Sequence, residues 1–186
     1  MNPLIPAFIA VFLAAWGERS QRVVAALAGR SGRSGLVLAG LALAAAVSSG
    51  LSAWAGALVA DLVTIRALTL LTALALLFAG VAGLIPRRAP SVEGRAPAIL
   101  AAFVLCLAAE MGDRAQFLTF AIAGRFDSPV LAAIGAAAGL VCACAPAALL
   151  GEEFTRAVPL RIVRPAIAAI FLVAAFIVGV NALELA

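Results

Sequence analysis

The sequence predicts an all-α integral membrane protein in which six transmembrane helices form two inverted three-helix repeats. Of the 186 residues, 66% are apolar, and the mean hydropathy is +1.18. A soluble domain is nearer to about 45–50% apolar. The apolar residues form long runs, and a short charged motif recurs 95 residues after its first appearance. The composition excludes an ordinary soluble domain, and the runs and the motif predict the number and arrangement of the helices.

Six apolar runs, bounded by charges, Gly and Pro, predict six helices. A helix needs about 20 residues to cross the hydrocarbon core of a bilayer, and each run is near or above that length. The runs are residues 3–28, 36–60, 66–85, 97–124, 129–150 and 160–183. The first and the fourth are long, and each is predicted to carry charges in the middle of its span.

The distribution of arginine predicts the orientation of these helices. The chain has no Lys and no His. Eight arginines lie in the loops after the first, third and fifth helices: Arg30, Arg33, Arg87, Arg88, Arg95, Arg156, Arg161 and Arg164. The loops after the second and fourth helices hold only Arg66 and Arg125. Basic loops stay in the cytoplasm, so both termini are predicted outside, in a multi-pass protein of the cell's inner (plasma) membrane.

A repeat of 95 residues divides the chain into two halves. LAAWGERSQ, residues 13–21, matches AAEMGDRAQ, residues 108–116. Further pairs follow at the same offset: Gly29 with Gly124, Gly40 with Gly135, Gly56 with Gly151 and Arg66 with Arg161. The predicted units are a first repeat at 1–85, a cytoplasmic linker at 86–96 and a second repeat at 97–186. Three spans per repeat insert the second copy upside down, and such transporters bind substrate where the repeats meet.

The repeated motifs supply the candidate site. Glu110 and Asp113 are three residues apart and would share one helix face, with Glu18 opposite on the other repeat. Amide oxygens of Gln21 and Gln116 and the hydroxyl of Ser20 could add to a metal site, while Arg19 and Arg114 would be counter-charges or gate elements. This set of oxygen donors suits hard divalent ions such as Ca²⁺, Mg²⁺ and Mn²⁺. The alternative is that the carboxylates only pair with the two arginines to hold helices together.

Other classes of function find less support in the sequence. The basic residues lie in short loops, so we expect no nucleic-acid partner. We expect no enzyme, because the chain lacks a Ser/His, Cys/His or His–metal constellation. Three cysteines, Cys106, Cys142 and Cys144, lie in apolar runs and are predicted to pack rather than form disulfides. The expected partners are the lipid bilayer, a transported cation and H⁺, with no tightly bound cofactor; the oligomeric state stays open.

The motifs EMGDRAQ, residues 110–116, and WGERSQ, residues 16–21, resemble the signature E-x-G-D-[KR]-[TS] of a known family. It is the Golgi-type calcium/manganese–proton exchanger family, uncharacterised protein family 16, among the lysine-exporter-like transporters. The resemblance covers nearly the whole chain. It implies export of Mn²⁺ or Ca²⁺ from the cytoplasm in exchange for H⁺, with Glu110 and Asp113 as metal ligands and Glu18 in place of the first motif's Asp.

Two positions depart from the signature of that family. Ala15 stands where the first motif has its Glu, and Ala115 stands where the second has Ser or Thr. The family pattern implies four acidic groups, of which this chain keeps three. The loss leaves a second hypothesis open, in which the chain is a diverged paralogue that does not transport and acts as a partner subunit.

Overall fold

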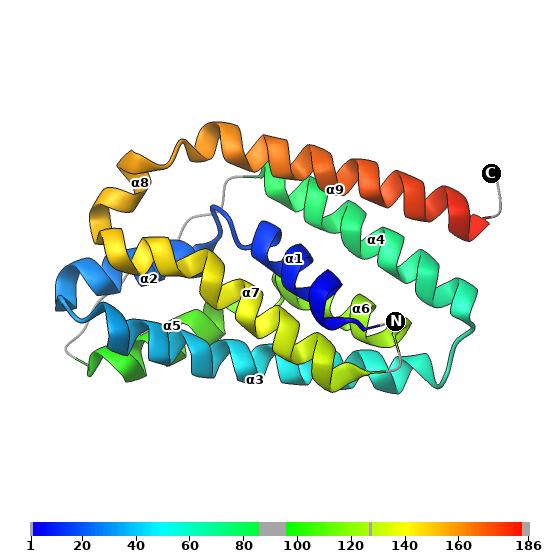
Figure 1. Ribbon diagram of the computed structural model, residues 1–186, viewed down its shortest axis with the longest axis horizontal. Helices are drawn as coiled ribbons and strands as arrows, with labels where there is room; N and C mark the ends of the chain where they lie inside the picture. The colour runs from blue at the N-terminus through cyan, green and yellow to red at the C-terminus, as the bar shows by residue number, and fades with distance from the viewer. Residues whose placement is uncertain (1, 86–95, 127, 184–186) are drawn as a thin grey trace.

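The computed structural model describes residues 2–85, 96–126 and 128–183, and the regular structure in these ranges is helical (Figure 1). The predicted linker at 86–96 lies almost wholly outside the described residues. The elements are α1 (Leu4–Ala14), α2 (Arg19–Ser31), α3 (Ser34–Ala60), α4 (Ile65–Leu84), α5 (Ala98–Glu110), α6 (Arg114–Arg125), α7 (Pro129–Leu150), η1 (Gly151–Glu153), α8 (Phe154–Ala157) and α9 (Leu160–Leu183).

Four of the described helical segments are long and apolar enough to cross a membrane. They are Ser34–Ala60, Ile65–Leu84, Pro129–Ala157 and Leu160–Leu183, with α1 and α5 as shorter apolar helices. Large apolar side chains cover their outer faces; Leu51, Trp54 and Phe176 are more than half exposed. Such a surface suits lipid and would be unusual on a soluble monomer. The prediction of an all-α membrane protein is confirmed at this level.

The two longest predicted helices are each broken in two, which corrects the prediction of one helix over 3–28 and one over 97–124. The first break separates α1 from α2, and the second separates α5 from α6. Gly17 has φ +75° in the first break, and Gly112 has φ +72° in the second. Glycine adopts this left-handed conformation without steric cost and commonly ends a helix with it. The charged motifs therefore lie at helix ends, where backbone groups are free to take other partners.

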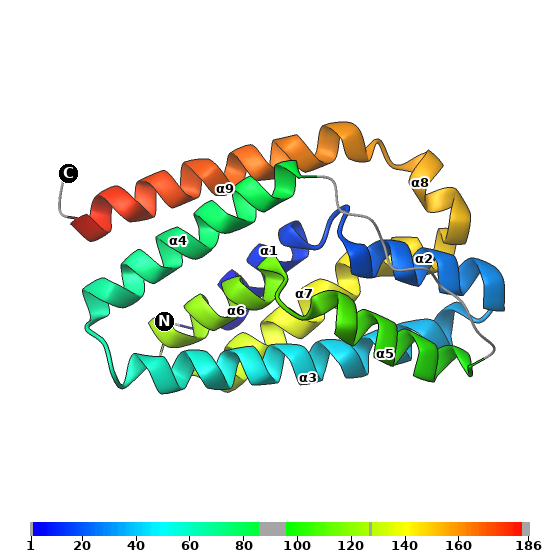
Figure 2. The same cartoon turned by 180° about the vertical axis from the view of Figure 1, so that it is seen from behind.

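The helices pack around these two breaks. α3 packs against α5, α6 and α7; α7 also packs against α1 and α2; and α4 pairs with α9 and contacts α6. Figures 1 and 2 show α4 and α9 side by side along one long edge of the molecule. α1 and α6 lie in the half of the long axis that contains the N-terminus, and α2 and α5 lie in the other half. The two breaks are thus near the middle of that axis.

The helix boundaries follow the spacing of the repeat. α2 and α6 begin at Arg19 and Arg114, α3 and α7 at Ser34 and Pro129, and α4 and α9 at Ile65 and Leu160. Each pair of starts is 95 residues apart. Corresponding helices also have corresponding neighbours, since α1 packs on α7 and α5 packs on α3.

Candidate functional site

The predicted site residues gather at the two helix breaks, and most of them are buried. Glu18 and Asp113 are the residues directly before α2 and α6, and Glu110 is the last residue of α5. Their exposed fractions are 3%, 5% and 2%. Ser20, Gln21 and Arg114 are buried as well, Gln116 is half-buried, and Arg19 is exposed. Because the helices are broken here, the expected helix face shared by Glu110 and Asp113 does not exist, and the breaks bring the groups together instead.

One contact between the halves joins Ser20 and Glu110. The Ser20 hydroxyl donates a hydrogen bond to Oε1 of Glu110. Ser20 lies in the first turn of α2 and Glu110 at the end of α5, and these two helices pack against each other. A buried carboxyl group needs such a partner, because burial without one is costly.

A second contact between the halves is the ion pair of Arg114 and Glu18. Nη2 of Arg114 lies 2.8 Å from Oε1 of Glu18. The guanidinium also donates to the carbonyl oxygens of Ala79, at 3.3 Å, and Trp16, at 3.2 Å. A Cβ added at Gly83 would lie 2.5 Å from Nη1 of Arg114, so the missing side chain of Gly83 makes room for the guanidinium. Arg114 therefore acts as the counter-charge of Glu18 in this structure, whereas Arg19 points to the exterior.

The two glutamines of the motifs stabilise the breaks. The backbone N–H of Gly17 donates to Oε1 of Gln21 at 2.8 Å, and that of Gly112 donates to Oε1 of Gln116 at 3.1 Å. The amide nitrogen of Gln21 donates to the carbonyl oxygen of Ala143 at 2.7 Å. The side-chain oxygens that the sequence suggested as metal ligands thus accept hydrogen bonds from the two break glycines here.

The carboxylates do not form a closed metal cage in this conformation. Over the described ranges, no three His, Cys, Asp or Glu side chains lie close enough together to hold a metal ion. The cysteines are free; Cys106 and Cys144 are buried and Cys142 is exposed. An ion bound by Glu110, Asp113 and Glu18 together would therefore require these side chains to rearrange.

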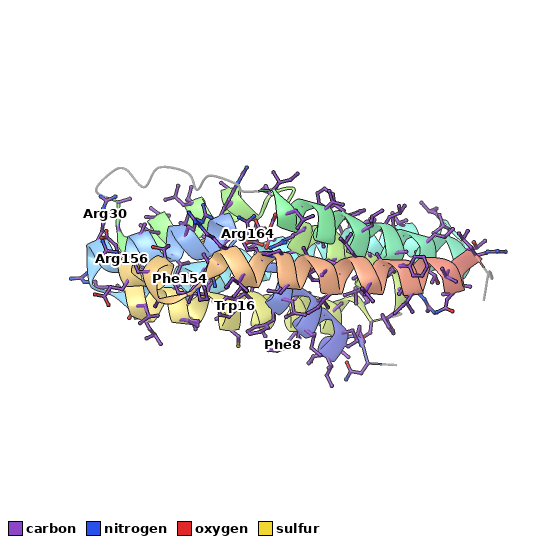
Figure 3. The ribbon with its side chains drawn as sticks, turned by 90° about the horizontal axis from the view of Figure 1, so that it is seen from above. Phe8, Trp16, Arg30, Phe154, Arg156 and Arg164 are labelled. Atoms are coloured by element: carbon purple, nitrogen blue, oxygen red, sulfur yellow. The ribbon has the colours of Figure 1, made fainter. Side chains whose placement is uncertain are left out.

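The surroundings of the two breaks differ. A cavity of about 570 Å³ lies beside the second break, and Asp113 and Gln116 are among its few polar lining residues. The first break is covered, because a Cβ added at Gly17 would lie 2.6 Å from Cδ of Arg164. Arg164 also donates to the carbonyl oxygen of Ile85, at 2.7 Å. Figure 3 shows Arg164 and Trp16 at a similar level along the long axis.

Sequence reasoning missed the residues that hold these groups in place. Arg164 counted only as a loop charge, and nothing in the sequence linked Ala79 or Gly83 to Arg114. The breaks did have a signal, which is a glycine followed directly by an acidic residue, as in Gly17–Glu18 and Gly112–Asp113. The glycine is suited to end one helix, and the acidic residue is the one that precedes the next, although its side chain makes no cap hydrogen bond at either break.

Comparison with known proteins agrees with the resemblance drawn from the motifs. The model of the family described as divalent cation/proton antiporter GDT1 matches residues 3–91 and 98–185. A protein of Vibrio cholerae serotype O1 described as "Putative manganese exporter" is 29% identical over 181 residues, which cover 94% of this chain and 89% of that protein. No solved structure matches the chain. The chain therefore belongs to the divalent cation/proton antiporter GDT1 family and is a multi-pass membrane transporter of divalent cations.

Proposed function

We propose that the chain exports Mn²⁺ from the cytoplasm in exchange for H⁺. The observation that carries this proposal is the set of three buried carboxyl groups, Glu18, Glu110 and Asp113, at two helix breaks in the middle of the molecule. Charged groups at membrane depth are costly and mark ion pathways. The name of the Vibrio cholerae relative favours Mn²⁺ over Ca²⁺, the other hard cation that such oxygen donors suit.

In this proposal, Glu110 and Asp113 bind the cation from one half, and Glu18 binds it from the other. Glu18 becomes available when Arg114 moves away from it, so cation entry and the loss of the ion pair are coupled. Broken helices also leave backbone carbonyl oxygens without helical partners, and these are common cation ligands in transporters. Gln21 and Gln116 hold the breaks in shape and can add an oxygen once the breaks rearrange.

Proton exchange follows from the same carboxyl groups. A carboxyl group must lose its proton to bind a metal ion, so metal binding releases protons. When the ion leaves, the buried Glu110 keeps Ser20 as its hydrogen-bond partner and can take up a proton in place of the metal. Cation export and proton import then use the same residue in alternation.

We further propose that the chain crosses the membrane six times as two inverted repeats. The pairs α1–α2 and α5–α6 would each make one crossing with a break at its middle, and α3, α4, α7 and α9 would make the other four. Both termini would then lie outside the cytoplasm, as the excess of arginine in alternate loops indicates. An inverted repeat is typical of secondary transporters that alternate between two open states.

The test uses a bacterial host that lacks its own manganese exporter. The chain should restore growth at high Mn²⁺, and Glu110→Gln and Asp113→Asn should each abolish this effect, because an amide lacks the charge that a divalent ion needs. Glu153→Gln is the matched control, since Glu153 is exposed and far along the chain from both breaks. Normal Mn²⁺ resistance in either site variant, at equal expression, would show that these carboxylates are structural.

Inside-out membrane vesicles test the exchange itself. An imposed pH gradient, acidic inside, should drive Mn²⁺ uptake, and an ionophore that removes the gradient should stop it. Ca²⁺ as the competing ion measures selectivity. Mn²⁺ uptake that does not depend on the imposed pH gradient would exclude H⁺ as the coupling ion.

A second hypothesis is favoured by one observation, the replacement of a motif Glu by Ala15. In that reading the chain does not transport and acts as a partner subunit of a transporter. The host experiment separates the two, because a partner subunit alone would give no Mn²⁺ resistance.

A further inference from the structure

We propose that Ala15 and Ala115 together are the vacated counterpart of the Ser20–Glu110 contact. The cation site then has one carboxyl–hydroxyl pair between its halves, where the repeat has room for two. This inference rests on the proposed function for its consequence in cation binding, but its structural part can be tested without transport.

Contacts between the halves recur when both partners are shifted by 95 residues. A Cβ added at Gly40 would collide with the carbonyl oxygen of Ile99, and one added at Gly135 would collide with that of Leu4. Ile99 and Leu4 are themselves 95 residues apart, as are Gly135 and Gly40. Each contact is therefore the image of the other.

Two further glycines repeat this pattern, Gly56 near the end of α3 and Gly151 directly after α7. A Cβ at Gly56 would meet backbone atoms of Phe120 and Gly124, and one at Gly151 would meet those of Ala25 and Gly29. The hydrogen bonds of Gly17 with Gln21 and of Gly112 with Gln116 are also images of each other. The local symmetry thus holds both at the breaks and along the helices that surround them.

The contact between Ser20 and Glu110 has its own image under this symmetry. The image of Ser20 is Ala115, and the image of Glu110 is Ala15. Both alanines are buried, with exposed fractions of 3% for Ala115 and 1% for Ala15, and both belong to the same apolar cluster. Where one half-site holds a carboxyl group and its hydroxyl donor, the other holds two methyl groups.

Losing either partner of such a pair makes the other unfavourable. A carboxyl group at position 15 facing Ala115 would be buried without its hydroxyl partner, which is costly. A hydroxyl group at position 115 facing Ala15 would likewise lose its acceptor. The two departures from the family signature are therefore one lost contact rather than two independent losses.

The charge of the remaining site fits a single divalent ion. Glu18, Glu110 and Asp113 contribute three negative charges when ionised, and Arg114 contributes one positive charge, so these buried side chains sum to −2. One Mn²⁺ neutralises this charge, and a second would leave an excess that nothing among these four groups compensates. The two half-sites are therefore unequal, and the summed charge of these four groups matches one divalent cation.

A double-mutant cycle tests the pairing. The purified protein, Ala15→Glu, Ala115→Ser and the double variant are compared by melting temperature in detergent with chelator present. Ala15→Glu alone should lower the melting temperature, and adding Ala115→Ser should recover more than half of that loss. The matched control is Ala15→Glu with Ala121→Ser, because Ala121 is also buried in α6 but is not the image of Ser20. In that control variant, the melting temperature should stay as low as in Ala15→Glu alone.

The outcomes distinguish this inference from the proposed function. Additive effects of the two substitutions would overturn the pairing, whatever the transport assay shows. If Ala15→Glu fails to fold, the cycle is repeated with Ala15→Gln, which has the same shape without the charge and should show the same recovery. Mn²⁺ binding by calorimetry should give one ion per chain for the unchanged protein, and a value of two would overturn the single-cation site. The double variant should bind Mn²⁺ about tenfold more tightly, since added carboxylate ligands tighten such sites.

Discussion

The contacts of a single residue, Arg114, hold Glu18 in an ion pair in this conformation. Its guanidinium contacts Glu18 from the other half, two backbone carbonyl oxygens and the space above Gly83. An arginine that is 1% exposed inside an apolar bundle must satisfy its charge and its donors locally. Removing one partner of a buried ion pair typically costs about 3–5 kcal/mol, because the other charge stays buried. In the proposed transport cycle, a cation that binds Glu18 would have to replace this interaction with a comparable one.

The substitution Gly83→Ala tests the position of the Arg114 guanidinium. The added methyl group would overlap the guanidinium, so we expect a loss of stability of about 1–3 kcal/mol from overpacking. Gly50→Ala is the control, because it lies in α3 with nothing within 4 Å of the added Cβ. The Gly50→Ala variant should be as stable as the unchanged protein or slightly more stable, because Ala favours the helical conformation more than Gly does. Equal melting temperatures for the two variants would contradict the described position of Arg114.

At the scale of elements, the sequence predicted four of the helices closely. The predicted runs 36–60, 66–85, 129–150 and 160–183 correspond to α3 (Ser34–Ala60), α4 (Ile65–Leu84), α7 (Pro129–Leu150) and α9 (Leu160–Leu183). The prediction missed the two breaks, because hydropathy over a long window does not detect three or four non-helical residues. It named Arg114 as a counter-charge of the carboxylates, but it missed the backbone carbonyl groups that Arg114 and Arg164 contact, because those contacts join helices far apart in the chain. Residue types could be predicted, but their pairing depends on packing.

Alanine substitutions at the two break glycines separate the cost of the left-handed backbone conformation from the cost of a side-chain overlap. Gly112→Ala has nothing within 4 Å of the added Cβ, so its cost should be the left-handed conformation alone, about 1–2 kcal/mol. Gly17→Ala carries the same conformational cost and also overlaps the side chain of Arg164. We therefore expect Gly17→Ala to be the more destabilising of the two.

The extra cost at Gly17 should disappear when its cause is removed. In an Arg164→Ala background, Gly17→Ala should cost no more than Gly112→Ala does in the unchanged protein. Melting temperatures of the four single and double variants measure this difference. A Gly17→Ala penalty that is independent of residue 164 would mean that Arg164 does not cover the first break.

At the scale of the whole molecule, equivalent helices have unequal surroundings. Arg164 covers the first break, while the second adjoins the cavity of about 570 Å³. α4 packs against α6, and the pair formed by α4 and α9 lies along one edge rather than around the centre. Two equivalent breaks in different environments are what a transporter needs if its two sides take turns in being accessible.

The proposed orientation can be measured by labelling cysteines in intact cells. In a background without Cys106, Cys142 and Cys144, Ser91→Cys in the predicted linker should react only with reagents that reach the cytoplasm. Asp61→Cys, at the exposed end of α3, should react with impermeant reagents from outside. The opposite pattern would reverse the topology, and reaction of both positions from one side would exclude the six-span arrangement.

The contact between Ser20 and Glu110 has a consequence for the gene as well as for the protein. The two partners lie in different halves of the 95-residue repeat. Two copies of the first half would place Ala15 against Ser20, and two copies of the second would place Glu110 against Ala115. Neither homodimer could form the pair, so the proposed site would need one half of each kind. Expressed as separate chains, the halves should therefore restore Mn²⁺ resistance only when both are present.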